Sequence, residues 1–191
     1  MARWDPDGRT RLQQAALALY SERGYESTTV AQIAERAGLT ERTFFRHFAD
    51  KREVLFFGSD VMQQQLTDAV ASAPESASPL EAATAGIEAA AGLLEERGPQ
   101  VRTRQAVVAA SPELQERELT KLAGLASALA ETLRGRGVAG PAAALTAEMA
   151  LAVFKIAVEQ WAQGDSKATL VDVIHESLAE LTAVTSQQVR R

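Results

Sequence analysis

The chain of 191 residues contains no cysteine and only two histidines, His47 and His175. Without cysteine there is neither a disulfide framework nor a thiolate nucleophile, which fits a cytoplasmic location. The two histidines lie far apart in the sequence, and no His, Cys or carboxylate cluster has metal-ligand or catalytic spacing. The sequence therefore predicts no metal site and no cofactor, and it disfavours a small helical enzyme.

Long apolar runs and alternating, strand-like runs are missing as well. No stretch of about eighteen apolar residues occurs, so no membrane span is expected. Apolar residues instead recur at intervals of three and four, and Ala, Leu, Glu and Arg dominate, which is typical of amphipathic helices. The sequence predicts an all-α fold of about nine helices. Those of the C-terminal part are expected at 80–97, 99–110, 113–135, 142–163 and 167–186.

Aromatic residues are scarce in the C-terminal part: eight of the ten precede residue 58, leaving only Phe154 and Trp161. Charge is divided in a similar way. Residues 1–57 carry nine Lys and Arg against eight Asp and Glu, whereas residues 58–191 carry eleven against seventeen. Because the net charge is −5, any basic surface must be local. Two regions of different character are indicated, and the stretch ASAPESASP at 71–79 is the candidate boundary.

The segment 29–48 meets the physical demands of a helix–turn–helix. The sequence TVAQ at 29–32 has the form of a capping box, and Thr40 can cap the following helix. Gly38 tolerates the positive φ of a sharp turn, and Ala34 is small enough for a close crossing of the two helices. The apolar volume of a small three-helix core is expected from Ile33, Ala37, Leu39, Phe44 and Phe48.

The outward face of the second of these helices carries the basic residues. Arg42, Phe45 and Arg46 lie three and four apart and therefore share a face. Glu41 and Thr43 flank that face at its N-terminal end. In a helix–turn–helix this end meets base edges in the major groove. The face is therefore a candidate surface for contact with DNA.

A second capping box, Asp50 to Glu53, follows the basic face. It predicts a longer helix that runs through Leu66 towards Val70. The free N–H groups at the start of this helix, together with Lys51, are placed to bind a phosphate, and His47 extends the contact along the DNA backbone. The combination of these features indicates DNA binding.

The stretch YESTTVAQIAERAGLTERTFFRHFADKREVL at 25–55 resembles the N-terminal domain of TetR-type transcriptional regulators. The shared pattern is T-T-V-x-x-I-A-x-x-A-G, then T-x-x-T-F-x-x-H-F, then x-D-K-R-x-x-L, within residues 8–66. The resemblance implies a DNA-binding domain at 6–66, with its helix–turn–helix at 29–48, and an effector-binding and dimerisation domain at 67–191. It implies backbone contacts from Thr29, Thr43, His47 and Lys51, base contacts from Glu41, Arg42 and Arg46, and a place on the same surface for Thr40 and Phe45.

One position departs from the family pattern. Phe45 stands where the family usually has tyrosine, so the hydroxyl contact to phosphate is lost, while the ring can still pack on a sugar or a thymine methyl. A neutral hydrogen bond contributes about 1 kcal/mol net. Arg42 or Arg46 is therefore expected to contribute more of the affinity in this chain.

Beyond residue 66 the resemblance implies a homodimer formed by the last two long helices. The sequence supports this independently, because helix 142–163 has two apolar stripes and should be covered on two sides. The predicted interface residues are Leu145, Met149, Ile156, Ile174 and Leu178. A two-fold dimer also suits a near-palindromic operator in double-stranded DNA. A monomeric bundle with a buried hairpin is the alternative.

The resemblance also implies a small-molecule effector, and the Leu, Val and Ala content of this region predicts an apolar one. Phe154 and Trp161 lie seven apart on one face and are candidate walls of a pocket, although such a pair is more often plain core. Arg102 and Gln105 are candidate polar contacts. The predicted function is thus a ligand-responsive transcriptional repressor with no membrane partner. Activation in place of repression stays open, and the alternative from another class is a helical interaction or scaffold protein that kept the fold without operator binding.

Overall fold

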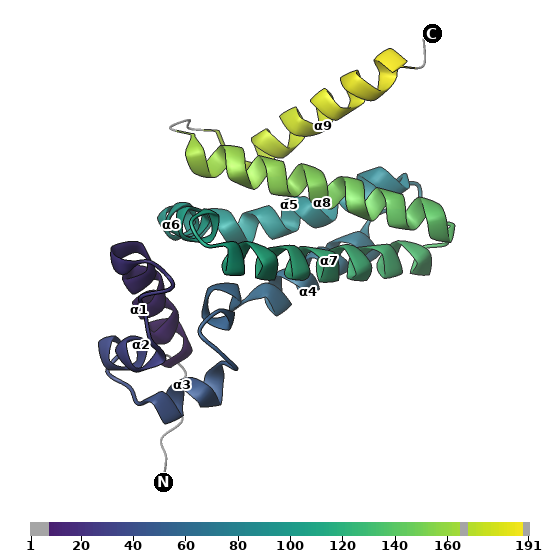
Figure 1. Ribbon diagram of the computed structural model, residues 1–191. Coiled ribbons are helices and arrows are strands. Elements are labelled where there is room, and N and C mark those ends of the chain that lie inside the picture. The colour runs from purple at the N-terminus through teal and green to yellow at the C-terminus, as the bar shows by residue number, and fades with distance from the viewer. Residues whose placement is uncertain (1–7, 165–167, 189–191) are drawn as a thin grey trace. The chain divides into compact units, whose positions relative to one another are not determined.

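All the secondary structure in the described part of the chain is helical. The computed structural model describes residues 8–164 and 168–188, which form nine α-helices and one 3₁₀ turn. This confirms the predicted all-α fold. Three predicted ends lie outside the described residues. They are the start of the DNA-binding domain at residue 6, the start of the last helix at residue 167 and the end of the second domain at residue 191. In chain order the elements are α1 (Gly8–Arg23), α2 (Val30–Arg36), α3 (Glu41–His47), η1 (Glu53–Phe56), α4 (Ser59–Ser72), α5 (Pro79–Glu95), α6 (Gly98–Ala109), α7 (Pro112–Gly135), α8 (Gly140–Gln163) and α9 (Leu170–Gln188) (Figure 1).

The helices of the C-terminal part begin and end where Gly, Pro and Ser punctuate the sequence. At the start of α5, Ser78 and Glu81 form a capping box: the Ser78 N–H donates to the Glu81 carboxylate, and the Glu81 N–H donates to Ser78 Oγ. Between α7 and α8, Gly137 has a φ of +89°, which ends one helix, and Pro141 stands in the first turn of the next. These local signals are sufficient to place the boundaries of the predicted helices within a few residues.

The structure corrects the predicted helix from Asp50 towards Val70. The Asp50 carboxylate does accept hydrogen bonds from the backbone N–H groups of Arg52 at 2.8 Å and Glu53 at 3.1 Å, as a cap should. The turn that follows is the short η1, however, and Gly58 then adopts a φ of +92° before α4 begins at Ser59. A capping box satisfies only the first free N–H groups, and the positive φ at Gly58 prevents one continuous helix.

The chain folds into two compact units. The first comprises the described residues up to Ser59 together with Arg102–Leu119, and the second comprises Asp60–Val101 together with the described residues from Thr120 onwards. This grouping differs from the predicted boundary after residue 66 and from a single C-terminal domain at 67–191. The segment Arg102–Leu119 belongs to the first unit because three of its side chains lie in the core of that unit, namely Val107, Val108 and Leu114.

The core of the first unit is formed by large side chains from several short elements. Leu12 of α1, Ile33 of α2 and Phe44 of α3 are fully buried within it. Ala34 is also buried where α2 approaches α3, and its carbonyl accepts a hydrogen bond from the Leu39 N–H at 2.8 Å. The predicted core of the helix–turn–helix is therefore present, with Leu39 half-buried at its edge.

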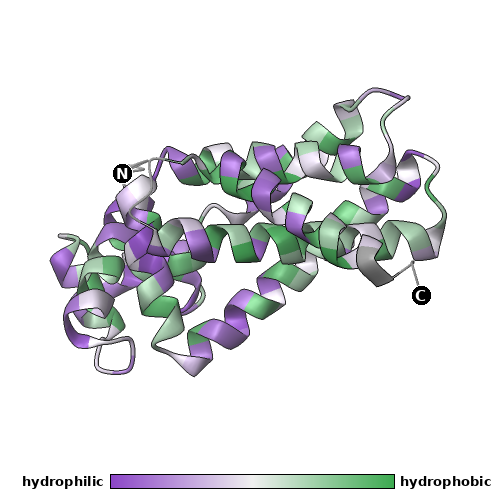
Figure 2. Ribbon diagram, turned by 90° about the horizontal axis from the view of Figure 1, so that it is seen from above, coloured by the Kyte–Doolittle hydropathy of each residue, from purple (hydrophilic) through white to green (hydrophobic). Residues whose placement is uncertain are grey.

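The second unit packs α5 against α8 and α9 through small residues. Alanines on the facing sides of α5 and α8 are almost completely buried, which lets the helix backbones approach closely: Ala82, Ala83, Ala90, Ala91, Ala143, Ala147, Ala150 and Ala157. Figure 2 shows the apolar positions as green bands that alternate with polar ones along the helices. The pattern is that of amphipathic helices around one core.

Among the described helices, only α8 is long and apolar enough to satisfy the length and composition test for a membrane span. The sequence predicted no span, because no unbroken apolar run is present. About half of the most apolar window of α8, 44%, is buried inside the unit, and Glu148 and Lys155 interrupt it. The core helix of a soluble protein satisfies the same test.

A glycine of α5 permits the close approach of α4. A Cβ added at Gly86 would lie 2.6 Å from Val70 Cγ2 and 3.0 Å from the Leu66 carbonyl oxygen. We therefore predict that Gly86→Ala lowers the free energy of unfolding by about 1–3 kcal/mol, the usual cost of overpacking. Gly92→Ala is the matched control, because it lies on the same helix with no atom within 4 Å, and it should be neutral or stabilising by about 0.5–1 kcal/mol. Urea unfolding followed by circular dichroism compares the two, and equal effects would refute the prediction.

Candidate nucleic-acid interface

The turn between α2 and α3 is held by backbone hydrogen bonds that require a glycine. Gly38 has a φ of +66°, in the left-handed region, and its N–H donates to the Glu35 carbonyl at 2.9 Å. At the start of α2, Thr29 and Gln32 form the predicted capping box. Thr40 caps α3 by accepting from the Thr43 N–H at 3.2 Å. These contacts fix where both helices of the helix–turn–helix begin.

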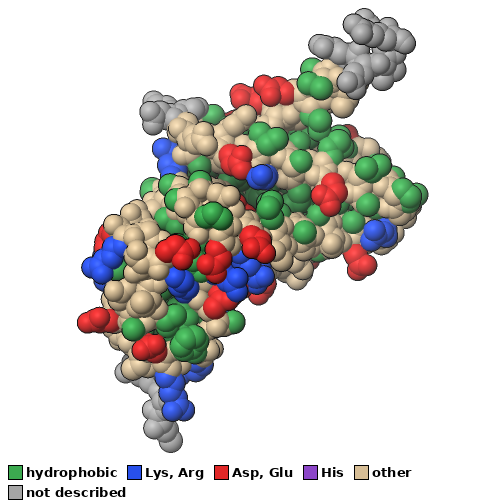
Figure 3. All heavy atoms as spheres, in the orientation of Figure 1, with side chains coloured by type: hydrophobic (Ala, Val, Ile, Leu, Met, Phe, Trp, Pro, Cys, Tyr) green, Lys and Arg blue, Asp and Glu red, His purple; other side chains and the backbone are tan. Residues whose placement is uncertain are grey.

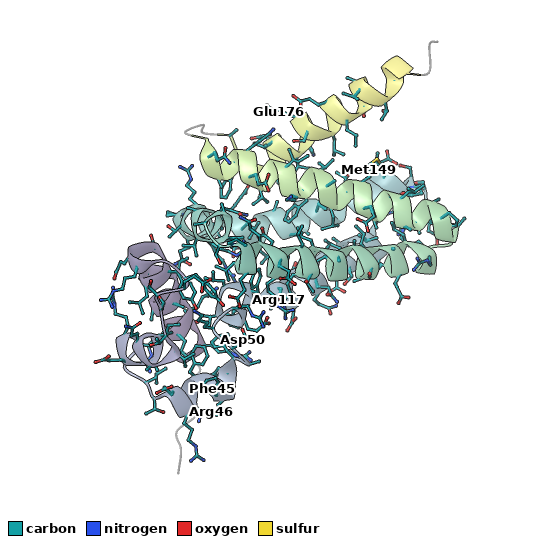
Figure 4. All side chains as sticks on the ribbon, in the orientation of Figure 1. Phe45, Arg46, Asp50, Arg117, Met149 and Glu176 are labelled. Atoms are coloured by element: carbon teal, nitrogen blue, oxygen red, sulfur yellow. The ribbon has the colours of Figure 1, made fainter. Side chains whose placement is uncertain are left out.

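Two buried phenylalanines determine which face of α3 is exposed. Phe44 is fully buried and Phe48 is nearly so, and their ring centroids lie 5.6 Å apart. The opposite side carries Arg42, Phe45 and Arg46, all exposed. The side chain of Phe45 is 55% exposed, and Figure 4 shows it and Arg46 projecting from α3 at the end of the first unit. Figure 3 shows basic side chains at this same end, beside exposed apolar atoms.

The remaining predicted DNA contacts lie around this face. Thr29, Thr40 and Glu41 are exposed, and Thr43 and His47 are half-buried. The hydroxyl oxygens of Thr40 and Thr43 lie 3.1 Å apart, within hydrogen-bond distance. With the exception of Thr29, which caps α2, these residues belong to α3 or its cap. The structure thus places seven of the nine predicted residues on α3 or at its cap, and an eighth, Thr29, at the start of α2.

Lys51 is placed differently from the expectation. Its Nζ donates to the backbone carbonyl oxygens of Tyr25 at 3.0 Å and Thr28 at 3.2 Å, and it lies 4.0 Å from the centroid of the Tyr25 ring. The helical turn that follows the Asp50 cap is only the short η1, and the long helix predicted to start there is absent. The ammonium of Lys51 is therefore engaged within its own unit.

A network of charged residues fastens the segment Arg102–Leu119 to the rest of the first unit. Arg104 donates to Glu118 at 2.7 Å and to the Leu55 carbonyl at 3.2 Å. Arg117 pairs with Glu53, and the Tyr25 hydroxyl donates to Glu113 at 3.2 Å. Burial and the neighbouring Glu113 carboxylate raise the pKa of Tyr25 well above its ordinary value, so it stays protonated. No local motif marks these partners, because they lie far apart in the sequence.

The candidate effector contacts fall in different units. Phe154 is buried in the core of the second unit and Trp161 packs against that core, as the simpler interpretation of the pair expects. Arg102, which is exposed, and Gln105, which is half-buried, belong to the first unit. Neither unit by itself therefore contains the four residues. The apolar effector stays a prediction from the resemblance.

The predicted interface residues divide into exposed and buried ones. Leu145 and Ile156 of α8 are 71% and 48% exposed, and Met149 lies half-buried on the same side of the helix. Leu178 is half-buried against the core of the second unit. Ile174, however, is fully buried in that core, so the structure corrects its assignment to an interface between chains.

Family models match two regions of the chain. Residues 12–56 match the model of the bacterial regulatory proteins of the tetR family. Residues 77–186, which are more than half of the chain, match the model of the MftR C-terminal domain. The chain therefore belongs to the TetR family of transcriptional regulators. Its relatives are regulators and not enzymes.

Individual relatives agree with the family assignment. The regulator TcmR from Streptomyces glaucescens is 39% identical over 84 residues, which cover 44% of this chain and 37% of TcmR, so the chain spans little more than a third of that relative's length. PfmR from Thermus thermophilus, a TetR-family regulator of solved structure, has a TM-score of 0.51 at 29% identity over 86% of this chain and 92% of its own. FadR from Bacillus subtilis, solved in complex with stearoyl-CoA, has a TM-score of 0.62 at 20% identity over 89% and 95%, which shows the fold alone.

The Asp50 carboxylate generates a pH-dependent prediction. Burial raises its pKa, but hydrogen bonds from the Arg52 side chain and from the Glu53 and Arg52 N–H groups outweigh burial and lower it. Because the folded pKa lies below the unfolded one, the ionised carboxylate stabilises the fold above about pH 3.9, and this stabilisation is lost as the pH falls through the folded pKa. We predict that Asp50→Asn lowers the free energy of unfolding by about 1 kcal/mol at pH 7, since the side chain is partly exposed.

The difference between Asp50→Asn and the wild type should shrink towards zero below about pH 3.9. Urea unfolding at pH 7, 5 and 3 measures it. The exposed Glu26 in the same unit offers the control Glu26→Gln, a surface substitution that should change the unfolding free energy at pH 7 by no more than about 0.5 kcal/mol. A destabilisation by Asp50→Asn that is the same at pH 3 as at pH 7 would contradict the role given to the ionised carboxylate.

Proposed function

We propose that this TetR-family regulator is a repressor that binds a near-palindromic operator in double-stranded DNA as a homodimer. The observation that carries the proposal is the exposed face of α3, on which Arg42, Phe45 and Arg46 are fixed by the burial of Phe44 and Phe48. Repressors are common in the family, and a reporter gene behind the operator distinguishes repression from activation. A rise in reporter transcription on deletion of the regulator supports repression, and a fall would contradict it.

The residues of the face suit different parts of DNA. Arg42 and Arg46 can each donate two hydrogen bonds to guanine O6 and N7, and Glu41 can accept from the amino group of cytosine. Phe45 has no hydroxyl and an exposed ring, so we assign it to a sugar or a thymine methyl. The Thr29 hydroxyl accepts the capping bond from the Gln32 N–H with its oxygen, which leaves its hydrogen to donate to a phosphate.

Thr43 and His47 complete the proposed contacts to the DNA backbone. Both lie half-buried beside the exposed arginines, and the Thr40 hydroxyl stands within hydrogen-bond distance of the Thr43 hydroxyl. Contacts of this kind hold the protein in register but carry no sequence information. Specificity is therefore assigned to Glu41, Arg42 and Arg46, with a contribution from Phe45.

Two features of the second unit support a second copy of the chain as partner. Leu145, Met149, Ala152 and Ile156 form an apolar stripe on the side of α8 that faces away from its own core. The last part of α9, residues 179–186, is exposed apart from the half-buried Leu181. Helical turns without tertiary contacts are marginal in water, and an apolar stripe of this kind should be covered. A two-fold pairing of α8 and α9 with the same helices of a second copy would cover both.

The dimer is tested with a charge in the apolar stripe. We predict that the wild type sediments at twice the chain mass of 20.4 kDa at micromolar concentration. Ile156→Asp should shift it towards the monomer, because burying an isoleucine contributes about 1.5–3 kcal/mol. In a two-fold dimer each copy carries the substitution, so this contribution is lost at two places in the interface. Val61→Asp changes a similarly exposed valine of α4 and should leave the mass unchanged. A wild-type mass near 20.4 kDa that does not vary with concentration would contradict the dimer.

Base recognition is tested by comparing two exposed arginines. Arg46→Ala should weaken binding to the operator by about 1–3 kcal/mol and relax discrimination at one base pair of each half-site. Arg36→Ala, on α2 and paired with Glu22 at 2.5 Å, removes the same charge away from the proposed face and should change affinity little. Titrations on the operator, on a point-mutated operator and on random DNA give the comparison. If Arg46→Ala weakens all three equally, Arg46 contacts phosphate and not a base.

A further inference from the structure

The side chain of Lys51 is enclosed by the segment that precedes α2. Two of its ammonium hydrogens are directed at the carbonyl oxygens of Tyr25, at 3.0 Å, and Thr28, at 3.2 Å. The ring of Tyr25 covers the ammonium at 4.0 Å, which is a close cation–π contact. The side chain is half-buried, and all these partners belong to the first unit. The ammonium is thus bound by oxygen atoms and an aromatic face of its own chain.

The residues that bind Lys51 form the turn between α1 and α2. In this turn Gly24 has a φ of +82°, and the buried Thr28 donates its hydroxyl hydrogen to the Gly24 carbonyl at 2.9 Å. The next residue, Thr29, caps α2. Lys51 is tied to α1 as well, because its carbonyl accepts a hydrogen bond from the Tyr20 hydroxyl at 2.6 Å. Through its backbone and its side chain, Lys51 therefore joins α1 to the residues that start the helix–turn–helix.

A phosphate would have to compete with these contacts. An ammonium group has three hydrogens to donate, and two of them are already donated to carbonyl oxygens of the turn. If Lys51 turned towards DNA, the Thr28 carbonyl would lose this donor and the Tyr25 ring its cation, and the Tyr25 carbonyl would keep only the hydrogen bond from the Thr28 N–H. The preformed geometry therefore favours a structural use of the charge over a contact with the DNA backbone.

We propose that Lys51 acts on operator binding as a positioning residue: it holds the turn at residues 24–28, and with it the cap of α2, in the arrangement that presents α3. The inference rests on the proposed function, because it takes α3 as the DNA-binding helix. It differs from a phosphate contact in a measurable way. A phosphate contact contributes about 0.9 to the slope of log affinity against log salt concentration, whereas a positioning residue contributes to affinity with little change in that slope.

The test compares Lys51→Met, which keeps the length of the side chain and removes its hydrogens, with Lys51→Arg, which keeps the charge. Lys51→Met should lower the melting temperature by about 4–8 °C. It should weaken operator binding about ten-fold, as the loss of one charged hydrogen bond would, and change the salt slope by less than half of one phosphate contact. Hydrogen exchange at the Gln32 and Ile33 amides should accelerate, because the α2 cap is loosened.

Lys51→Arg gives opposite expectations for the two roles and serves if Lys51→Met fails to fold. A planar guanidinium cannot reproduce the placement of the ammonium between two carbonyls and a ring, so a positioning role predicts weaker operator binding with the salt slope unchanged. A phosphate contact predicts wild-type affinity for Lys51→Arg, together with a slope lower by about one unit and an unchanged melting temperature for Lys51→Met. The results expected of a phosphate contact would overturn the inference about Lys51 and leave the proposed function standing. A wild type that prefers no DNA sequence over random DNA would overturn the proposed function with it.

Discussion

Phe44 and Phe48 can both enter the core of the first unit in only one rotation of α3 about its axis. Side chains four apart share a face of a helix, so the burial of these two rings directs Arg42, Phe45 and Arg46 to the opposite side. A unit with so small an interior needs large side chains to exclude water, and phenylalanine supplies them. The packing of the core therefore also determines the composition and direction of the surface that we assign to DNA.

Residues from elsewhere in the chain reinforce this core. The segment Arg102–Leu119 adds Val107, Val108 and Leu114 to it, and its Arg117 pairs with Glu53 of the turn at 50–53. Arg52 pairs with Asp50 at 2.8 Å and approaches Glu113 at 3.6 Å. The short helices α2 and α3 have few internal hydrogen bonds, so their order depends on caps, on the Gly38 turn and on this packing.

Local sequence signals predicted most of the fold. Capping residues and Gly or Pro breaks placed the starts of α2, α3 and α5, because these signals act within one helical turn. The box at Asp50 is a similar signal, yet the helix it predicted is absent, since Gly58 at a φ of +92° interrupts the chain. The contacts of Lys51 with Tyr25 and Thr28, and those of Arg104 with Glu118, could not be predicted. They depend on how separate elements pack, which no short motif encodes.

The candidate interface shows a different limit of sequence patterns. An apolar stripe predicts which face of a helix is shielded from water, but it does not predict whether the same chain or a second copy covers that face. On α8 the stripe of Leu151, Phe154 and Val158 is covered by its own unit, whereas Leu145 and Ile156 stay exposed. Ile174 was expected at the interface and lies in the core instead, because its spacing on α9 suits either role.

The central claim is that paired copies of α3 recognise DNA with two-fold symmetry. The most direct measurement is selection of bound sequences from random DNA, followed by footprinting of the selected sites. The account predicts an inverted repeat whose half-sites lie about one helical turn, or a multiple of it, apart, with both halves protected together. Selected DNA without an inverted repeat, or no enrichment over the starting pool, would contradict it.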